Sequence, residues 1–212
     1  AKTAAAEAHL SRQLRAADLR FDSPTGKKVY VALLLGHPGG AQRESCITVV
    51  ASIGRSPQNP RSWTVTPDGK TAKTVLRVHA FSEEHGLSLV SAELYTGRTH
   101  QIRVHCSHCG APVANDSLYA TEAQSRFFRR SFSHGLSKGR QLLHAWALDL
   151  QHPADGRSLA LRAPLPADME RIVQRVWPDM SLDPSSWSNI PSRLLQGRCS
   201  GAPRPQPAAL AD

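Results

Sequence analysis

Residues 94–109 read LYTGRTHQIRVHCSHC, a stretch in which the pattern of apolar residues changes from that of a strand to that of a helix. Four side chains recur at i, i+3, i+4 and i+7, the spacing of one helical face. They are Ile102, His105, Cys106 and Cys109. Thr99 is placed to cap the start of this helix and Gly110 to end it. We therefore expect residues 95–99 to form a strand-to-helix junction.

Runs of apolar and β-branched residues on both sides of this junction predict strands. They are residues 27–35 (KKVYVALLL), 46–52, 74–81, 87–95, 141–150 and 158–162. Residues 54–69 contain Pro57, Pro60 and Pro67 and predict a loop. Because most of the connections between neighbouring strands are short, we expect antiparallel pairing.

Helices are expected at both ends of the domain, over residues 1–17 and after Pro166. This order of elements predicts an α+β fold, a mainly antiparallel mixed sheet flanked by helices. We expect one domain over residues 1–180 and a Pro-, Ser- and Ala-rich tail over residues 181–212. Because the first helix is already under way at Ala1, we also expect further residues before it.

The chain of 212 residues is strongly basic, with 26 Lys and Arg against 17 Asp and Glu and a formal net charge of +9. Such a surplus favours a nucleic acid as partner, although a solvated basic surface would have the same composition. Four cysteines are too few for a disulfide framework, so we expect a reducing intracellular compartment. A mitochondrial location is compatible with this charge but is not implied by it. No run approaches the ~18–20 apolar residues of a membrane span, and no membrane partner is expected.

Arg98 is the first candidate for a functional side chain, because Gly97 and the junction aim it from a fixed backbone. A guanidinium makes two parallel hydrogen bonds to a carboxylate or a phosphate. Gln101 and Arg103, one turn further on, add polar groups that could reach a bound RNA. The alternative for Arg98 is a surface arginine that caps the helix.

Residues 126–140 read RFFRRSFSHGLSKGR and contain no acidic side chain. Basic side chains bind phosphates and aromatic rings stack on unpaired bases, so the stretch is expected to be an RNA-contacting loop. Its basic residues are Arg126, Arg129, Arg130, Lys138 and Arg140. The alternative is a solvated loop with one or two phenylalanines anchored in the core.

Cys106 and Cys109 have C-x-x-C spacing beside His105, which suggests zinc. No second pair of ligands follows, and both thiols lie on the predicted core face of the helix, where cysteine acts as a small hydrophobic residue. We therefore predict no metal site.

The run GRTHQIRVH at residues 97–105 resembles the signature of the RluA-type RNA pseudouridine synthases, and other stretches resemble motifs of that family in the same order. They are A-K-T at 1–3, K-x-Y-x-A-L-x-x-G at 28–36, G-x-P-x-x-x-D-x-x-Y at 110–119, L-H-A at 143–145, H-P at 152–153 and A-P-L-P at 163–166. The resemblance extends over residues 1–177. It implies an isomerase that converts uridine to pseudouridine in ribosomal or transfer RNA, without a metal or an organic cofactor.

The resemblance also assigns roles to two side chains. Arg98 would hold a catalytic aspartate ionised and oriented, while Tyr30 would pack on the flipped base and assist proton transfer. The alternative for Tyr30 is an ordinary strand tyrosine packed in the sheet. Asp116 corresponds to an aspartate with a structural role in that family.

The family's catalytic aspartate lies in an H-R-L-D segment upstream of the A-K-T helix, and the 212 residues contain no such segment. Two explanations are open. The aspartate lies in residues outside this chain, or the protein is a non-catalytic RNA-binding factor of ribosome assembly with ribosomal or assembly proteins as partners. In either case we expect no pseudouridine formation by these 212 residues alone.

Overall fold

A seven-stranded sheet forms the centre of the computed structural model, which describes residues 2–15, 27–42, 45–132, 136, 139–180 and 186. The strand order is β3-β2-β4-β5-β1-β6-β7, and each of these neighbouring pairs is antiparallel. The strands are β1 (Lys27–Leu35), β2 (Cys46–Arg55), β3 (Trp63–Val65), β4 (Lys70–Ser82), β5 (Leu87–Leu94), β6 (Leu143–Gln151) and β7 (Ser158–Arg162). The predicted α+β class is confirmed.

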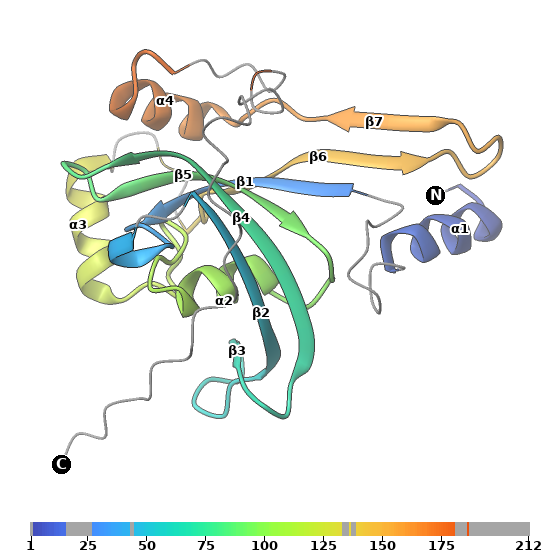
Figure 1. Ribbon diagram of the computed structural model, residues 1–212, viewed down its shortest axis with the longest axis horizontal. Coiled ribbons are helices and arrows are strands. Elements are labelled where there is room, and N and C mark those ends of the chain that lie inside the picture. Colours follow the sequence, from blue (N-terminus) through green and yellow to red (C-terminus); the bar gives the residue numbers. More distant parts are fainter. Residues whose placement is uncertain are drawn as a thin grey trace.

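Among the described residues, four α-helices accompany the sheet, together with a short 3-10 helix, η2 (Gly40–Gln42). They are α1 (Ala4–Arg15), α2 (Gln101–His108), α3 (Glu122–Phe132) and α4 (Ala167–Val176). Figure 1 shows α1 beside the β6–β7 hairpin, apart from the other three helices. In the described part of the chain, no helix has both the length and the apolar character needed to cross a bilayer.

Strand β1 separates two hydrophobic cores, because successive side chains of a strand point to opposite faces of the sheet. Val31 and Leu33 belong to the core that contains the buried side chains of α3 and α4, among them Phe128 and Met169. On the opposite face, alternate side chains of β1 pack with α2. That second core includes Ala32, Leu34, Ile102 and Cys106, with Tyr30 at its margin.

Helix α2 starts differently from the prediction that Thr99 caps it. The N-cap is His100, whose backbone is left-handed with φ of 55° and whose side chain makes no capping hydrogen bond. The helix is held at this end by a bond from Val104 N–H to the His100 carbonyl oxygen, 2.9 Å long. Gly110 follows the helix with φ of 75°, as predicted for a residue that ends it.

Two stretches that were expected to be loops form regular structure. Residues 54–69 contain β3, which exists because it pairs with the end of β2. Residues 126–132 belong to α3, whose buried Phe128 and Phe132 stack with ring centroids 5.2 Å apart. The loop prediction failed because arginines hide the helical spacing of these two rings. Lys138 and all of the predicted tail except Ser186 lie outside the described residues.

Helix α1 is fastened to the sheet by polar contacts as well as by packing. The Gln13 carboxamide pairs with the backbone of Gln151 like a neighbouring strand, accepting from its N–H at 2.7 Å and donating to its carbonyl oxygen at 2.8 Å. Lys28 Nζ donates to the Leu14 carbonyl oxygen at 3.2 Å, near the negative end of the helix. Burial lowers the pKa of Lys28. These contacts join the first helix to β1 and β6.

Candidate functional site

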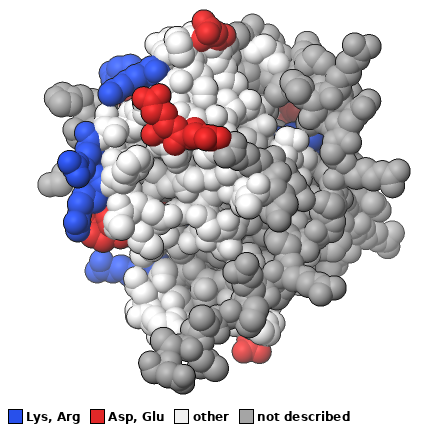
Figure 2. Space-filling model, turned by 60° about the vertical axis from the view of Figure 1, so that its left-hand side comes forward, with Lys and Arg blue, Asp and Glu red and all other residues white. Residues whose placement is uncertain are grey.

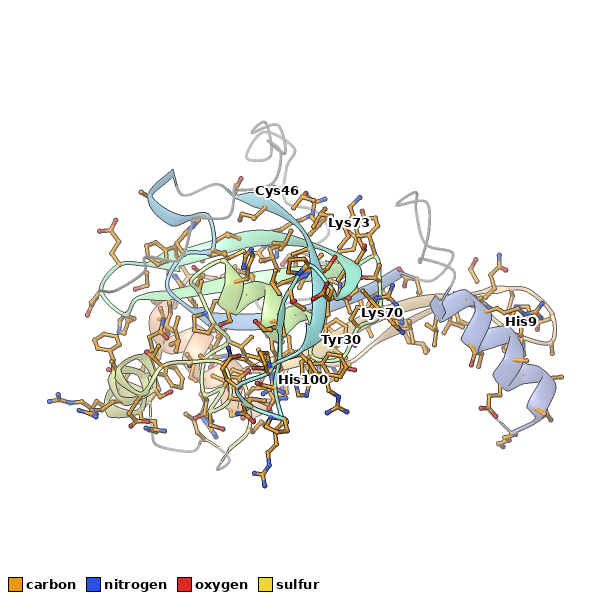
Figure 3. All side chains as sticks on the ribbon, turned by 90° about the horizontal axis from the view of Figure 1, so that it is seen from below. His9, Tyr30, Cys46, Lys70, Lys73 and His100 are labelled. Atoms are coloured by element: carbon orange, nitrogen blue, oxygen red, sulfur yellow. The ribbon has the colours of Figure 1, made fainter. Side chains whose placement is uncertain are left out.

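Tyr30 lies where the pairing of β1 with β6 is irregular. Val29 pairs with Ala147 but Tyr30 pairs with Ala145, so Trp146 is an extra residue in β6. A bulge of this kind turns the local side chains and is common beside active sites. Tyr30 is partly exposed and lies on the face of the sheet that α2 covers. Figure 3 labels it in the central part of the molecule, far from His9 on α1.

Arg98 lies in the connection between β5 and α2, as predicted. Its backbone N–H donates to Gln101 Oε1 at 3.0 Å, and its Nε donates to the Thr71 carbonyl oxygen at 3.1 Å. Thr71 belongs to β4, and β5 separates β4 from β1. Arg98 is therefore tied to a strand that is two positions away from that of Tyr30, and it precedes the helix that covers the Tyr30 face of the sheet.

Gln101 does not lie on the surface, where an RNA contact was expected. It is 3% exposed, and its side chain forms its hydrogen bonds inside the protein. Its Oε1 accepts from Thr96 Oγ1 at 2.7 Å as well as from Arg98 N–H. Its Nε2 donates to the Lys73 carbonyl oxygen and to Thr74 Oγ1, both at 2.9 Å. The carboxamide thus fixes the junction to β4 and positions the backbone of Arg98.

Arg103 is likewise held within the protein. Its Nε and Nη2 donate to the two carboxylate oxygens of Asp116 at 2.6 and 2.7 Å. The Asp116 side chain is completely buried and also accepts from Leu118 N–H at 3.0 Å. Burial alone would lower the pKa of Arg103, but the hydrogen bond and charge of Asp116 outweigh it and raise that pKa. The structural role that the resemblance implies for Asp116 agrees with this geometry, whereas Arg103 is not available in the way an RNA contact requires.

Tyr119 connects the start of α2 to β3, a contact that no local pattern predicts although this tyrosine ends the G-x-P-x-x-x-D-x-x-Y motif. Its hydroxyl accepts from Trp63 N–H at 3.0 Å and lies 2.8 Å from Nδ1 of His100. Burial and the charge of Arg103 lower the pKa of His100, despite the opposing charge of Asp116. A neutral His100 can accept a hydrogen bond from the Tyr119 hydroxyl. This hydroxyl therefore donates one hydrogen bond and accepts another.

Two further histidines lie in the sheet region and are not used by any predicted chemistry, and of these His79 is partly buried. His105 on α2 is fully buried, with Nδ1 at 2.9 Å from Thr74 Oγ1. His79 Nε2 lies 2.9 Å from Ser91 Oγ. Burial lowers the pKa of each to about 4. These imidazoles are neutral at physiological pH.

The outer face of α3 carries three of the expected RNA-contacting residues, which we call the basic α3 surface. They are Arg126, Arg129 and Arg130, all exposed. Phe127 beside them is 53% exposed. Helix α3 lies on the side that is turned forward in Figure 2, where Lys and Arg side chains line one edge. Arg140 is placed differently, because its Nη1 forms an ion pair with Asp168 of α4 at 3.2 Å.

The two cysteines at the end of α2 lie on its core side, as their helical spacing predicts. Cys106 is completely buried and Cys109 is partly buried. Burial raises the pKa of the Cys106 thiol well above its usual range. It raises the pKa of the Cys109 thiol to about 11, so the thiolate form that binds zinc is disfavoured at both positions. Within the described ranges, no cluster of three or more His, Cys, Asp or Glu side chains has a metal-binding arrangement.

Comparison with known proteins places this geometry in a family. The RNA pseudouridylate synthase family model matches residues 2–108, which include Tyr30 and Arg98. An RNA pseudouridine synthase of Chloroflexus aurantiacus is 39% identical over 150 residues, 71% of this chain and 42% of the relative. The ribosomal large subunit pseudouridine synthase D of Nitrosomonas europaea is 36% identical over 176 residues, 83% of this chain and 46% of the relative.

A solved structure agrees with these sequence matches. Human RNA pseudouridylate synthase domain containing 1 aligns with a TM-score of 0.59 and 27% identity, over 82% of this chain and 72% of that one. The chain spans less than half the length of the two bacterial relatives described above. Taken with the motifs around Tyr30 and Arg98, these matches show that the chain belongs to the RluA-type RNA pseudouridine synthase family.

Proposed function

We propose that this chain is part of an enzyme that isomerises uridine to pseudouridine within RNA. The observation that carries the proposal is the position of Tyr30 in β1 opposite the bulge of β6, on the sheet face covered by the helix that Arg98 precedes. Such a site needs an aromatic face for the everted base and a fixed cation for the attacking carboxylate. Tyr30 and Arg98 supply these two groups.

The two side chains lie at different positions along the sheet. Tyr30 pairs with Ala92 of β5, which pairs with Leu76 of β4, whereas Arg98 is tied to Thr71, five residues from Leu76 along β4. They therefore address different parts of a bound nucleotide, with the face of the base on Tyr30. The guanidinium then orients a carboxylate at the sugar, where the C1′–N1 bond breaks before the base turns and the C1′–C5 bond forms. C5 then loses its proton and N1 gains one, so the product is an isomer of the substrate.

We infer that the substrate is ribosomal RNA. The relative from Nitrosomonas europaea is named as an enzyme of the large ribosomal subunit, and the net charge of +9 suits any large polyanion. The basic α3 surface supplies cations on the outside of the domain, where phosphates of a folded RNA can reach them.

A non-catalytic alternative remains a second proposal, because the 212 residues contain no H-R-L-D segment. An RNA-binding factor of ribosome assembly would keep the fold and the basic α3 surface without using the carboxylate. We expect the 212-residue chain to bind ribosomal RNA in both cases and to form no pseudouridine by itself.

One experiment separates these proposals. The complete product of the gene and the 212-residue chain are each incubated with a ribosomal RNA transcript, and pseudouridine is measured by nucleoside mass spectrometry. Turnover by the complete protein, abolished by Arg98→Ala, supports the enzyme. Binding without turnover by the complete protein supports the assembly factor. Failure of both forms to bind RNA contradicts both proposals.

Tyr30→Phe in the complete protein tests the second assigned side chain. This variant keeps the stacking face and removes the hydroxyl, so RNA affinity should stay the same while turnover falls. Tyr30→Ala removes both and should reduce affinity as well. Equal turnover by wild type and both variants would exclude Tyr30 from the reaction.

A further inference from the structure

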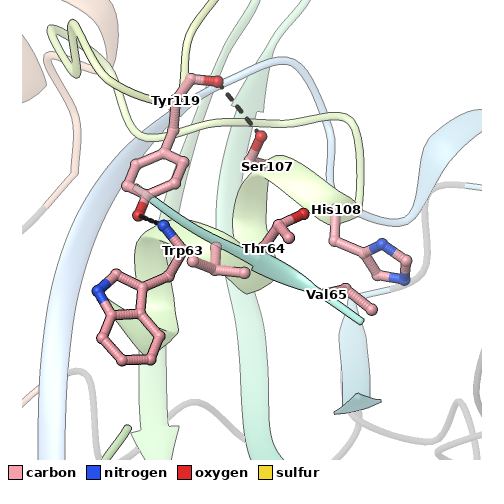
Figure 4. A pocket seen from close by; sticks show the side chains of 7 residues that line it. Trp63, Thr64, Val65, Ser107, His108 and Tyr119 are labelled. Carbon is pink, nitrogen blue, oxygen red and sulfur yellow. Dashed lines mark hydrogen bonds between the residues drawn. The ribbon is translucent and has the colours of Figure 1, made fainter. Parts of the chain in front are cut away.

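A pocket of about 230 Å³ lies between the edge strand β3 and α2, on the side of α2 that carries Val104 and His108 (Figure 4). The residues that line it combine two aromatic rings, aliphatic side chains and polar groups. They are Trp63, Thr64, Val65, Val104, Ser107, His108 and Tyr119. A drug-sized ligand occupies roughly 300–1,000 Å³, so this pocket suits a smaller group, such as one planar heterocycle.

The edge of β3 gives one wall of the pocket hydrogen-bonding groups that follow from the register of the sheet. Thr66 N–H bonds Ser52 O at 2.9 Å and Ser56 N–H bonds Ser62 O at 3.1 Å. Along an antiparallel ladder, every second residue of a strand forms a hydrogen-bonded pair. Halfway between Ser62 and Thr66, the backbone groups of Thr64 therefore point to β2. The backbone groups of the residues on either side of Thr64 therefore point away from β2.

Trp63 follows this alternation, because its N–H donates to the Tyr119 hydroxyl across the pocket wall. The Val65 N–H and the carbonyl oxygens of Trp63 and Val65 point to the same side of the strand. Donor and acceptor groups thus stand next to each other on a straight edge. The rim of a nucleobase presents donors and acceptors in the same way.

The opposite wall is rigid. Ser107 Oγ donates to the Tyr119 carbonyl oxygen at 3.2 Å, while the Tyr119 hydroxyl is held at Trp63 and His100. Both ends of this tyrosine are therefore fixed before any ligand arrives. A preformed site loses less entropy on binding than one that has to be ordered.

Positive charge lies beside the Trp63 ring, since the Arg55 guanidinium is 5.3 Å from the centre of that ring. The Arg103 guanidinium lies 4.8 Å from the centre of the Tyr119 ring, but its charge is neutralised by Asp116. Arg61, in the connection that leads to β3, is exposed. A base that enters the pocket carries its phosphates to this rim, whereas a neutral ligand gains nothing from the charge.

We propose that the pocket binds one unpaired base of the substrate RNA, separate from the uridine that is isomerised. The proposal rests on the function proposed above, because it assumes an RNA substrate. Val65 and Val104 provide the apolar floor, the edge of β3 reads the rim of the base, and Arg55 contacts the adjoining backbone.

The test uses the 212-residue chain and a short single-stranded RNA in which the uridines are replaced by 4-thiouridine. After irradiation, the crosslinked peptides are identified by mass spectrometry, and affinity is measured by fluorescence anisotropy. His108→Trp fills the pocket from its exposed side without touching the core. His152→Trp, on the β6–β7 turn, is the matched control. Thermal denaturation checks that both variants fold.

We expect crosslinks to residues 63–65 or to Tyr119 in the wild type and in His152→Trp, and their loss in His108→Trp. Affinity should fall at least about fivefold in His108→Trp alone, the lower end of the value of one stacked base. Crosslinks confined to α3, with unchanged affinity of His108→Trp, overturn the pocket proposal and leave the proposed function intact. Absence of any saturable RNA binding overturns the proposed function and this inference together.

Discussion

Arg103 binds both carboxylate oxygens of Asp116, with Nε–Oδ2 and Nη2–Oδ1 distances of 2.6 and 2.7 Å. This pair joins the middle of α2 to the segment that follows Gly110. Within that segment, the Asp116 carboxylate also accepts a hydrogen bond from Leu118 N–H. The carboxylate is completely buried and the guanidinium is 14% exposed. The segment that presents Tyr119 to His100 therefore depends on an interior ion pair.

Asp116→Asn should destabilise the fold strongly. The substitution keeps the size of the side chain but leaves the buried Arg103 charge uncompensated, which costs about 3 kcal/mol or more. Urea denaturation measures the free energy of unfolding. Glu122→Gln is the control, since the Glu122–Arg129 pair is exposed and its loss should cost no more than about 1 kcal/mol. Equal effects of the two variants would contradict the structural role of Asp116.

The stability of the domain should fall as the pH is lowered from about 6.5 to about 4. Burial lowers the pKa of His79 and of His105 to about 4, while an unfolded histidine has a pKa of about 6.5. Within this window the unfolded state binds more protons, so each histidine contributes a slope of about 1.4 kcal/mol per pH unit, and the contribution is complete above it.

His105→Gln tests this pH dependence, because it removes one of the two titrating groups. The variant should show a flatter decline in unfolding free energy between pH 6.5 and pH 4 than the wild type, measured by urea denaturation at several pH values. His9→Gln, a partly exposed position on α1, serves as the control. A wild-type stability that stays level across this range would show that the two imidazoles are not buried as described.

Tyr119→Phe should loosen β3 from α2. The ring remains, but Trp63 N–H loses its acceptor and His100 loses its partner, at a cost of about 1–2 kcal/mol. Hydrogen exchange should show faster exchange of the Trp63 amide, while amides of β7, at the other edge of the sheet, keep their rates. Unchanged protection of Trp63 would exclude Tyr119 as the group that fastens β3.

Charge reversal on the basic α3 surface should weaken RNA binding and reduce its dependence on salt. Arg129→Glu combined with Arg130→Glu removes two cations, and each lost phosphate contact lowers the slope of log K against log salt by about 0.7. Affinities at several salt concentrations give this slope. Arg157→Glu combined with Arg162→Glu, two exposed charges of the β6–β7 hairpin, changes the net charge by the same amount and is the control. If the α3 variant and the control change the slope equally, α3 lies outside the RNA footprint.

Local patterns in the sequence predicted much of the fold. The continuous apolar run of β1 and the short β7 have the bounds that were expected, and α2 follows from the helical spacing of Ile102 and Cys106. Gly110 ends that helix because a residue with positive φ is needed there. Each of these features depends on neighbours along the chain, which is why the residues alone are sufficient.

Other features form only when the sheet is assembled. β3 is three residues long, and only its register against β2 makes it a strand. The arginines of α3 are typical of a solvated loop, and this segment is a helix because Phe128 and Phe132 pack in the core. Such elements are stabilised by partners that are far away in the sequence, and no local pattern records them.

By itself the sequence determined the family, the strand-to-helix junction and the identities of Tyr30 and Arg98 as candidates. Only the tertiary structure decided that Gln101 and Arg103 serve the interior, and that Tyr119 fastens β3 to α2. The physical reason is that a polar side chain has the same hydrogen-bonding groups on a surface and in a core. Which of them are used depends on the atoms that folding brings within about 3 Å.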